Sequence, residues 1–167
     1  VIDVQRIMFE YPLHQPELLL DSILHLTNEA RESGAPVIFI QHNDEEIVTG
    51  SEGWKLHKRL TPIDGEQVIQ KTRPDSFYRT TLDDELRSRD VDVLVICGIQ
   101  TDYCVDTTCR AAASREYTVV LATDAHSTFD NDVLSAEKII AHHNRTLTSS
   151  FAAGVEARSV NFRDYSR

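Results

Sequence analysis

The amino-acid sequence predicts an α/β protein built around a central, mainly parallel β-sheet. Short runs of β-branched residues alternate with longer segments of helical periodicity along the whole chain, which is the pattern of repeated strand–helix units. The strand runs are apolar on consecutive residues rather than on alternate ones, as expected for strands that helices cover on both faces. These two features together predict a three-layer α/β/α sandwich.

The strands are predicted in six places. Val1 and Ile2 form the end of a first strand, and the sequence leaves open whether an apolar stretch comes before them. The remaining runs are residues 37–40, 68–70, 91–97, 118–122 and, with a weaker pattern, 155–162.

The helices are predicted between these runs. Residues 16–32 carry apolar side chains at positions 19, 20, 23, 24 and 26, and the pattern stops at Ser33 and Gly34, shortly before a proline. Thr80 or Thr81 is expected to cap a second helix that runs to about residue 89, since acidic residues fill its first turn. Further helices are predicted over 103–115 and 133–145. The segment 43–64 has no clear period, and a loop of this length is often a pocket wall or a lid.

Length, charge and cysteine usage narrow the classes of function. A chain of 167 residues predicts a single domain over 1–167. The net charge of −10 gives no attraction to nucleic acid or to an anionic membrane surface. No apolar run reaches the roughly 20 residues that cross a bilayer, and no secretory signal is recognisable. Three cysteines without a metal-type C-x-x-C pair fit a reducing compartment, so a cytoplasmic protein is expected.

Three reactive side chains come after predicted strands. In open parallel sheets, ligands bind beyond the C-terminal ends of the strands, where loops and helix N-termini converge. Asp3 follows the first strand, Lys71 follows the third, and Cys104 follows the fourth at the start of a predicted helix. An acid, a cation and a thiol at one edge of a sheet indicate covalent chemistry.

Three motifs around these residues carry a family resemblance. They are Ile2-Asp3-Val4-Gln5, then Gln70-Lys71-Thr72-Arg73-Pro74-Asp75-Ser76-Phe77, and finally Cys97-Gly98-Ile99-Gln100-Thr101-Asp102-Tyr103-Cys104-Val105. In this order the chain resembles the isochorismatase-like cysteine hydrolases, a superfamily that includes nicotinamidases, N-carbamoylsarcosine amidases and ureidoacrylate amidases. The resemblance implies a Rossmann-like sheet with strand order 3-2-1-4-5-6, and a homodimer or homotetramer.

The resemblance also implies a role for each motif residue. Cys104 attacks a carbonyl carbon, and Asp3 accepts the thiol proton, passes it to the departing amine and later activates the water that cleaves the thioester. Lys71 keeps both neighbours in usable protonation states. By the same resemblance, the peptide bond between Ile99 and Gln100 is cis, and the N–H groups of Gln100 and Cys104 form the oxyanion hole.

Cys104 has to lose its proton in order to attack. An ordinary thiol with a pKa near 8.5 is only about 3% ionised at pH 7. The first turn of a helix favours a thiolate, and Lys71, by the resemblance, adds a positive charge beside it. A lowered pKa is therefore expected for Cys104, while Cys97 and Cys109 are expected to pack in the core.

A metal cofactor is not expected. Nicotinamidases of this superfamily hold a divalent ion on an Asp-x-His pair after strand two, where this chain has Gln41 and Asn43, neither of them a strong ligand for zinc-type metals. His42 and His57 could form a different site with Asp44, although solvated or hydrogen-bonded histidines are the simpler interpretation.

The substrate pocket is the least specific part of the prediction. Trp54, Phe77 and Tyr103 are candidates for aromatic pocket walls, and Gln5 and Gln100 for amide hydrogen bonds; ordinary packing or exposure is an equal alternative for each. The expected activity is hydrolysis of a carbon–nitrogen bond in a small amide or carbamoyl compound through a thioester. The alternatives are a nicotinamidase and a catalytically silent small-molecule binding protein of the same fold.

Overall fold

The computed structural model describes residues 1–165 and contains parallel strands in two hydrogen-bonded groups. β1 (Ile38–His42) pairs with β2 (Gln67–Lys71). β3 (Val93–Ile99) pairs with β4 (Thr118–Ser127), which pairs in turn with the short β5 (Ala153–Val155). All three pairings are parallel, so the predicted α/β class with parallel strands is confirmed.

Ile2 lies between the two groups of strands. It forms parallel bridges to Ile40 of β1 and to Gly98 of β3. Its N–H donates to the carbonyl of Cys97, and the N–H of Asp3 donates to the carbonyl of Ile40. Val1 and Ile2, predicted as the end of a first strand, thus lie between β1 and β3, and Val1 also bonds to β1. Because the strands are grouped as β1–β2 and β3–β4–β5, the order 3-2-1-4-5-6 of one continuous sheet stays a prediction.

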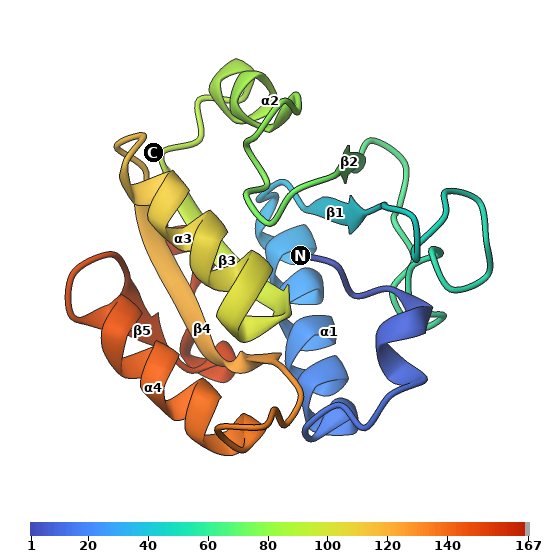
Figure 1. Ribbon diagram of the computed structural model, residues 1–167. Helices are drawn as coiled ribbons and strands as arrows, with labels where there is room; N and C mark the ends of the chain where they lie inside the picture. The colour runs from blue at the N-terminus through green and yellow to red at the C-terminus, as the bar shows by residue number, and fades with distance from the viewer. Residues whose placement is uncertain (166–167) are drawn as a thin grey trace.

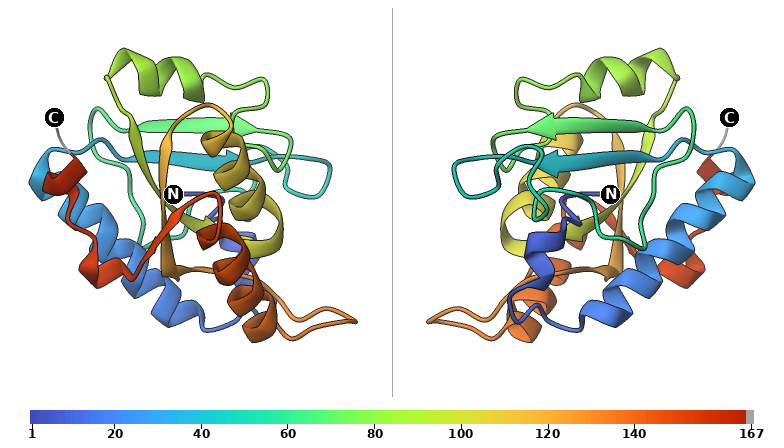
Figure 2. Two further views of the ribbon diagram at one scale, coloured as in Figure 1. Left: turned by 90° about the vertical axis from the view of Figure 1, so that its left-hand side faces the viewer. Right: turned by 90° about the vertical axis from the view of Figure 1, so that its right-hand side faces the viewer.

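Helices cover the strands from both sides. α1 (Pro16–Ser33) lies on one side, while α3 (Asp106–Ala113) and α4 (Ala136–Thr148) lie on the other, and α2 (Leu82–Ser88) lies beyond β2 (Figures 1 and 2). α1 ends where the sequence predicts, because Gly34 has a φ of +78° in the left-handed region that favours glycine. The apolar residues of α1 face the core at helical spacing: Leu19, Leu20, Ile23 and Leu26.

The structure differs from the predicted elements at several ends. The strand predicted over 155–162 was wrong beyond Val155, since single turns at Ala157–Ser159 and Phe162–Tyr165 replace it. β4 runs past its predicted end at 122 because other segments bond its polar residues: the N–H of Ala157 donates to Asp124, and the Asn144 amide donates to the Thr123 carbonyl.

Two helices begin differently from the prediction. α4 begins at Ala136 rather than at 133, because the Asp130 carboxylate accepts a hydrogen bond from the N–H of Ala136 and caps the helix there. The helix predicted over 103–115 starts as a π-helical turn at Thr101–Val105 and continues as α3.

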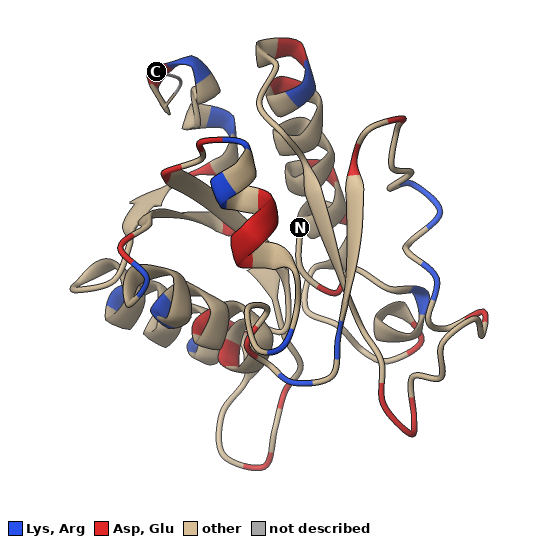
Figure 3. Cartoon of the chain, turned by 90° about the horizontal axis from the view of Figure 1, so that it is seen from above, with Lys and Arg blue, Asp and Glu red and all other residues tan. Residues whose placement is uncertain are grey.

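Acidic and basic residues are both distributed along the helices and loops (Figure 3). Within the described part of the chain, none of the helices combines the length and the apolar composition that a membrane crossing requires.

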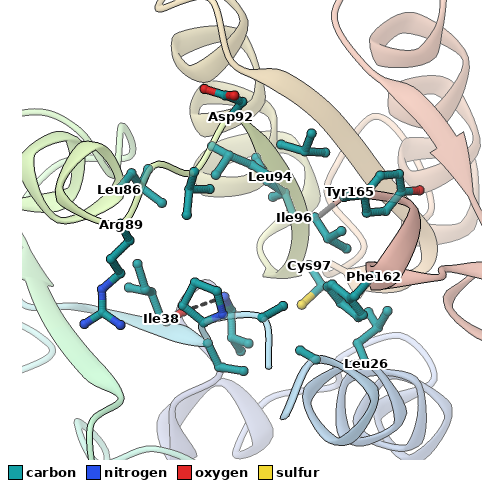
Figure 4. A pocket seen from close by; sticks show the side chains of 18 of the residues that line it. Leu26, Ile38, Leu86, Arg89, Asp92, Leu94, Ile96, Cys97, Phe162 and Tyr165 are labelled. Carbon is teal, nitrogen blue, oxygen red and sulfur yellow. Dashed lines mark hydrogen bonds between the residues drawn. The ribbon is translucent and has the colours of Figure 1, made fainter. Parts of the chain in front are cut away.

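A cavity of about 740 Å³ lies between β1 and β3 (Figure 4). Ile38, Leu94 and Ile96 line it together with Leu26 of α1 and Leu86 of α2, so its walls are largely apolar. It extends along β3 back to the strand's N-terminal end, and Asp3, Lys71 and Cys104 are not among its lining residues. The cavity is therefore separate from the predicted catalytic residues.

Candidate active site

The structure brings Asp3, Lys71 and Cys104 together from three distant parts of the chain. Asp3 follows the bridging residue Ile2, Lys71 is the last residue of β2, and Cys104 lies in the π-helical turn after β3. The ammonium Nζ of Lys71 lies 2.6 Å from Oδ2 of Asp3 and donates a hydrogen bond of 3.2 Å to Sγ of Cys104. The ammonium of Lys71 therefore contacts both the carboxylate and the thiol.

Lys71 reaches this point across a neighbouring strand. Lys71 is paired with His42 of β1, and β1 is bridged to Ile2, so Lys71 and Asp3 start two strand spacings, ~10 Å, apart. The long lysine side chain spans that gap and is almost fully buried, with 2% of its surface exposed.

Two backbone features shape the other side of the site. Asp3 has a φ of +50°, which is uncommon for a residue other than glycine. Gly98 has a φ of +129°, and a Cβ atom at this position would lie 2.0 Å from the carbonyl oxygen of Ile2. Glycine is therefore required for β3 to approach Ile2 this closely. Directly after this close approach, the peptide bond between Ile99 and Gln100 is cis.

The expected lowering of the Cys104 pKa was wrong. Burial raises the pKa of the thiol to about 12, and the charge of Asp3 adds to this rise, while Lys71 opposes it. Desolvation also raises the pKa of Asp3, against the opposing charge of Lys71. The helix end and the ammonium are outweighed because the site excludes water and places a carboxylate beside the sulfur. Cys104 therefore keeps its proton at rest, and Asp3 has an increased affinity for one.

Lys71 has a third contact that the sequence analysis missed. Its Nζ lies 3.2 Å from Nδ1 of His42, and Nε2 of the same ring lies 3.1 Å from Oδ2 of Asp44. The sequence analysis considered His42 and Asp44 only as possible metal ligands. One sequence feature pointed to a role for His42 in the site. It follows the predicted strand that lies between the strand before Asp3 and the strand before Lys71. Within residues 1–165, no three His, Cys, Asp or Glu side chains gather as a metal site would require.

Gln5 and Trp54 belong to the same hydrogen-bonded group. Nε2 of Gln5 donates to the carbonyls of His42 and Trp54, and its Oε1 accepts from the N–H of His42. Both amide hydrogens of Gln5 are thus used to fasten the 43–64 loop to β1, which leaves none for a ligand. The indole N–H of Trp54 donates to Gln70 of β2.

The other two pocket candidates lie in different environments. Phe77 is buried, stacks on Tyr117 at 5.9 Å between ring centroids, and has the Arg115 guanidinium over its ring, so it packs as a core residue. Tyr103 is 57% exposed directly before Cys104 in the chain. Phe77 also lines the cavity between β1 and β3, whereas Tyr103 is open to solvent.

A second group of polar residues that the sequence analysis missed supports the π-helical turn. Nδ1 of His126 lies 2.9 Å from the hydroxyl of Thr101, and Nε2 lies 2.8 Å from Oδ1 of Asn144. Burial lowers the pKa of His126 to about 4, so this histidine is neutral near pH 7. Thr128 donates to Asp102 in the same turn. The segment that carries Cys104 is thus tied to β4 and α4.

The comparison with known sequences agrees with these motifs. Residues 1–149 match the profile of the family described as Isochorismatase domain. The chain belongs to the isochorismatase family. The isochorismatase family protein YddQ of Bacillus subtilis is 31% identical over 151 residues, which are 83% of this chain and 84% of YddQ.

Two relatives with named activities match shorter regions. A streptothricin hydrolase of Streptomyces noursei is 38% identical over 63% of this chain and 43% of its own length. The ureidoacrylate amidohydrolase RutB of Methylobacterium radiotolerans is 41% identical over 50% of this chain and 32% of its own length. This chain therefore matches less than half the length of either enzyme.

Solved structures show the same isochorismatase fold. An isochorismatase family protein with 35% identity superposes with a TM-score of 0.88, covering 93% of this chain and 95% of that chain. The fold that surrounds Asp3, Lys71 and Cys104 is therefore that of the isochorismatase-like hydrolases.

Proposed function

We propose that this isochorismatase-family protein is a cysteine hydrolase that cleaves a carbon–nitrogen bond of a small amide or carbamoyl compound through a thioester. The observation that supports this most directly is the position of the Lys71 ammonium, 2.6 Å from Asp3 and 3.2 Å from the Cys104 sulfur. The amidohydrolase name of one relative points to the same kind of bond.

The proposed reaction uses Asp3 as the base. Because burial keeps the proton on Cys104 and raises the pKa of Asp3, the thiol proton moves to Asp3 as the sulfur bonds to the carbonyl carbon. The N–H groups of Gln100 and Cys104 stabilise the resulting oxyanion. Asp3 then gives its proton to the departing nitrogen, and the carbon–nitrogen bond breaks. The ammonium of Lys71 lies beside both groups and balances the negative charge on the Asp3 carboxylate or on the Cys104 sulfur.

The second half of the proposed cycle hydrolyses the thioester. Asp3 takes a proton from water, whose oxygen attacks the thioester carbon, and the carbon–sulfur bond breaks. The sulfur leaves as a thiolate beside Lys71 and recovers its proton from Asp3. No metal is needed in this scheme, in line with Gln41, whose amide is bonded to the Trp54 carbonyl and to Gln70. The proposal includes a single domain, the strand order 3-2-1-4-5-6 and a homodimer or homotetramer.

Mass spectrometry of the intact protein tests the proposal. We expect an aldehyde analogue of an amide substrate to add to the wild-type protein, and the adduct to disappear in Cys104→Ala. Exposure to a panel of small amides and carbamoyl compounds is expected to release ammonia. Asp3→Asn is expected to lose ammonia release while staying folded by circular dichroism, with a lower melting temperature because Lys71 loses its buried counter-charge.

The alternative of a silent binding protein makes the opposite prediction. Ligands from the panel would then raise the melting temperature, while neither an adduct nor ammonia would form. That result would reject the proposed hydrolase.

A further inference from the structure

The ammonium group of Lys71 has three acceptors at hydrogen-bonding distance. An ammonium carries three N–H bonds. Oδ2 of Asp3 lies at 2.6 Å, Sγ of Cys104 at 3.2 Å and Nδ1 of His42 at 3.2 Å. The ammonium is therefore ion-paired with Asp3 and has hydrogen-bonding contacts with Cys104 and His42, so removing His42 takes away one acceptor of a buried cation.

This contact determines which ring nitrogen of His42 carries the proton. Because the Lys71 ammonium can only donate, Nδ1 of His42 has to accept, and the proton of the neutral ring lies on Nε2. Nε2 faces Oδ2 of Asp44 at 3.1 Å. The N–H at Nε2 therefore donates a hydrogen bond to the Asp44 carboxylate.

Asp44 and His42 are themselves held in place. Oδ1 of Asp44 accepts from the N–H groups of Glu46 and Ile47, and these bonds, the Ile47 bond first, lower the pKa of Asp44. The backbone of His42 is bonded on both sides to the buried side chain of Gln5. The imidazole is thus fixed at its backbone and at its outer nitrogen.

The three residues form a path from the buried site to the surface. The Lys71 side chain is fully buried, His42 is 15% exposed and Asp44 is 43% exposed. The charged or titratable groups around the imidazole are Lys71 and Asp44 in direct contact, with Asp3 and Cys104 on the far side of the ammonium.

We propose that His42, oriented by Asp44, is a positioning residue that holds the Lys71 ammonium between Asp3 and Cys104. The proposal rests on the proposed function, because it assigns His42 a part in making Cys104 reactive. The reactivity of Cys104 therefore depends on a hydrogen-bond acceptor at the position of Nδ1 of His42.

Alkylation of Cys104 by iodoacetamide tests the positioning role of His42 without any substrate. The rate of modification of Cys104 is followed by intact mass, with Cys104→Ala identifying the site, since Cys97 and Cys109 are buried. His42→Leu keeps a similar volume without an acceptor, and we expect alkylation at least about tenfold slower than in the wild type. His42→Asn places Oδ1 near the position of Nδ1, and we expect a rate within about threefold of the wild type.

A matched control separates positioning from a general effect of losing a histidine. His142 is exposed on α4, and His142→Leu is expected to leave the alkylation rate unchanged. Wild-type rates in both His42 variants would overturn the proposal. So would equal losses in Leu and Asn variants that keep the wild-type melting temperature, because a purely structural role does not need an acceptor.

The tautomer of the His42 ring provides a second test. Nitrogen-15 NMR of labelled histidine is expected to find the neutral ring protonated on Nε2 and to lose this preference in Lys71→Met. A proton on Nδ1 in the wild type would refute the proposed contact.

These readouts are independent of turnover. Slow alkylation in His42→Leu together with no ammonia release on any amide would retain the positioning role and reject the hydrolase. Normal turnover, together with the same alkylation rate in the wild type and in His42→Leu, would retain the hydrolase and reject the positioning role.

Discussion

Replacing Lys71 by methionine removes the charge that balances Asp3 in the buried site. Asp3 is 1% exposed and Lys71 is 2% exposed, so water cannot take the place of the lost ammonium. Removing one partner of a buried ion pair costs ~3–5 kcal/mol when the other partner remains charged. Asp3 can escape this cost by binding a proton, and the loss of stability therefore depends on pH.

The direction of this pH dependence follows from the pKa of Asp3. Burial already raises this pKa above the ordinary value of 3.8, and Lys71 opposes the rise. Without Lys71 the pKa rises further. A carboxyl whose pKa is raised in the folded state stabilises the fold below its unfolded pKa and loses that contribution as the pH rises through the folded value. Every tenfold increase in the proton affinity of Asp3 corresponds to about 1.4 kcal/mol.

Urea unfolding at about pH 5 and about pH 8 measures this effect. We expect Lys71→Met to be clearly less stable relative to wild type at the higher pH, and the difference to vanish when Asp3→Asn is added. The matched control is Lys55→Met, which removes a lysine from an exposed ion pair with Glu52 and is expected to cost less than ~1 kcal/mol at either pH. An equal loss of stability at both pH values, retained in the double variant, would refute the reasoning.

Three further predictions concern other parts of the molecule. Gly98→Ala is expected to lower the urea midpoint severely or to prevent folding, because the new Cβ would meet the Ile2 carbonyl at 2.0 Å; Gly65→Ala, with a φ of +88° and open space around it, is expected to cost only ~1–2 kcal/mol. For His126, burial lowers the pKa from 6.5 to about 4, so wild-type stability is expected to fall by up to about 3 kcal/mol as the pH drops through this range. His126→Gln is expected to flatten that slope in urea titrations, and an unchanged slope would argue against a neutral buried ring. Trp54→Ala is expected to raise KM far more than it lowers Tm; wild-type tryptophan fluorescence that does not change with bound ligand would count against a place in the pocket.

The sequence predicts the parallel strands and most helices because their signals are local. α1 shows this best, since its apolar spacing and its glycine stop can be found without knowledge of any neighbour. The end of β4 could not be found in this way. Thr123, Asp124 and His126 look like turn residues until α4 and the segment at Ala157 supply their hydrogen-bond partners.

The site likewise has features that sequence can predict and features that depend on the folded chain. Asp3, Lys71 and Cys104 can be found by a topological rule, because each follows a strand and reactive groups gather where parallel strands end. The ionisation of Cys104 could not be predicted, since it depends on how completely the folded chain excludes water from the sulfur. The position of His42 at the end of β1 places it near the path of Lys71, but the sequence does not show the contact itself. It requires the lysine to cross a strand, and strand spacing does not say which side chain the ammonium meets on the way.

The raised pKa of Cys104 has a consequence for how such a site can work. A thiolate held permanently beside Lys71 would be ready to attack, but it would be exposed to oxidation and alkylation. A thiol that gives its proton to Asp3 only during attack is protected at rest, and the raised pKa of Asp3 makes that transfer easier. The ammonium has to remain in place while the negative charge moves from the carboxylate to the substrate oxygen. A lysine with a third partner in His42 is better held for this than one bonded only to the two groups that change charge.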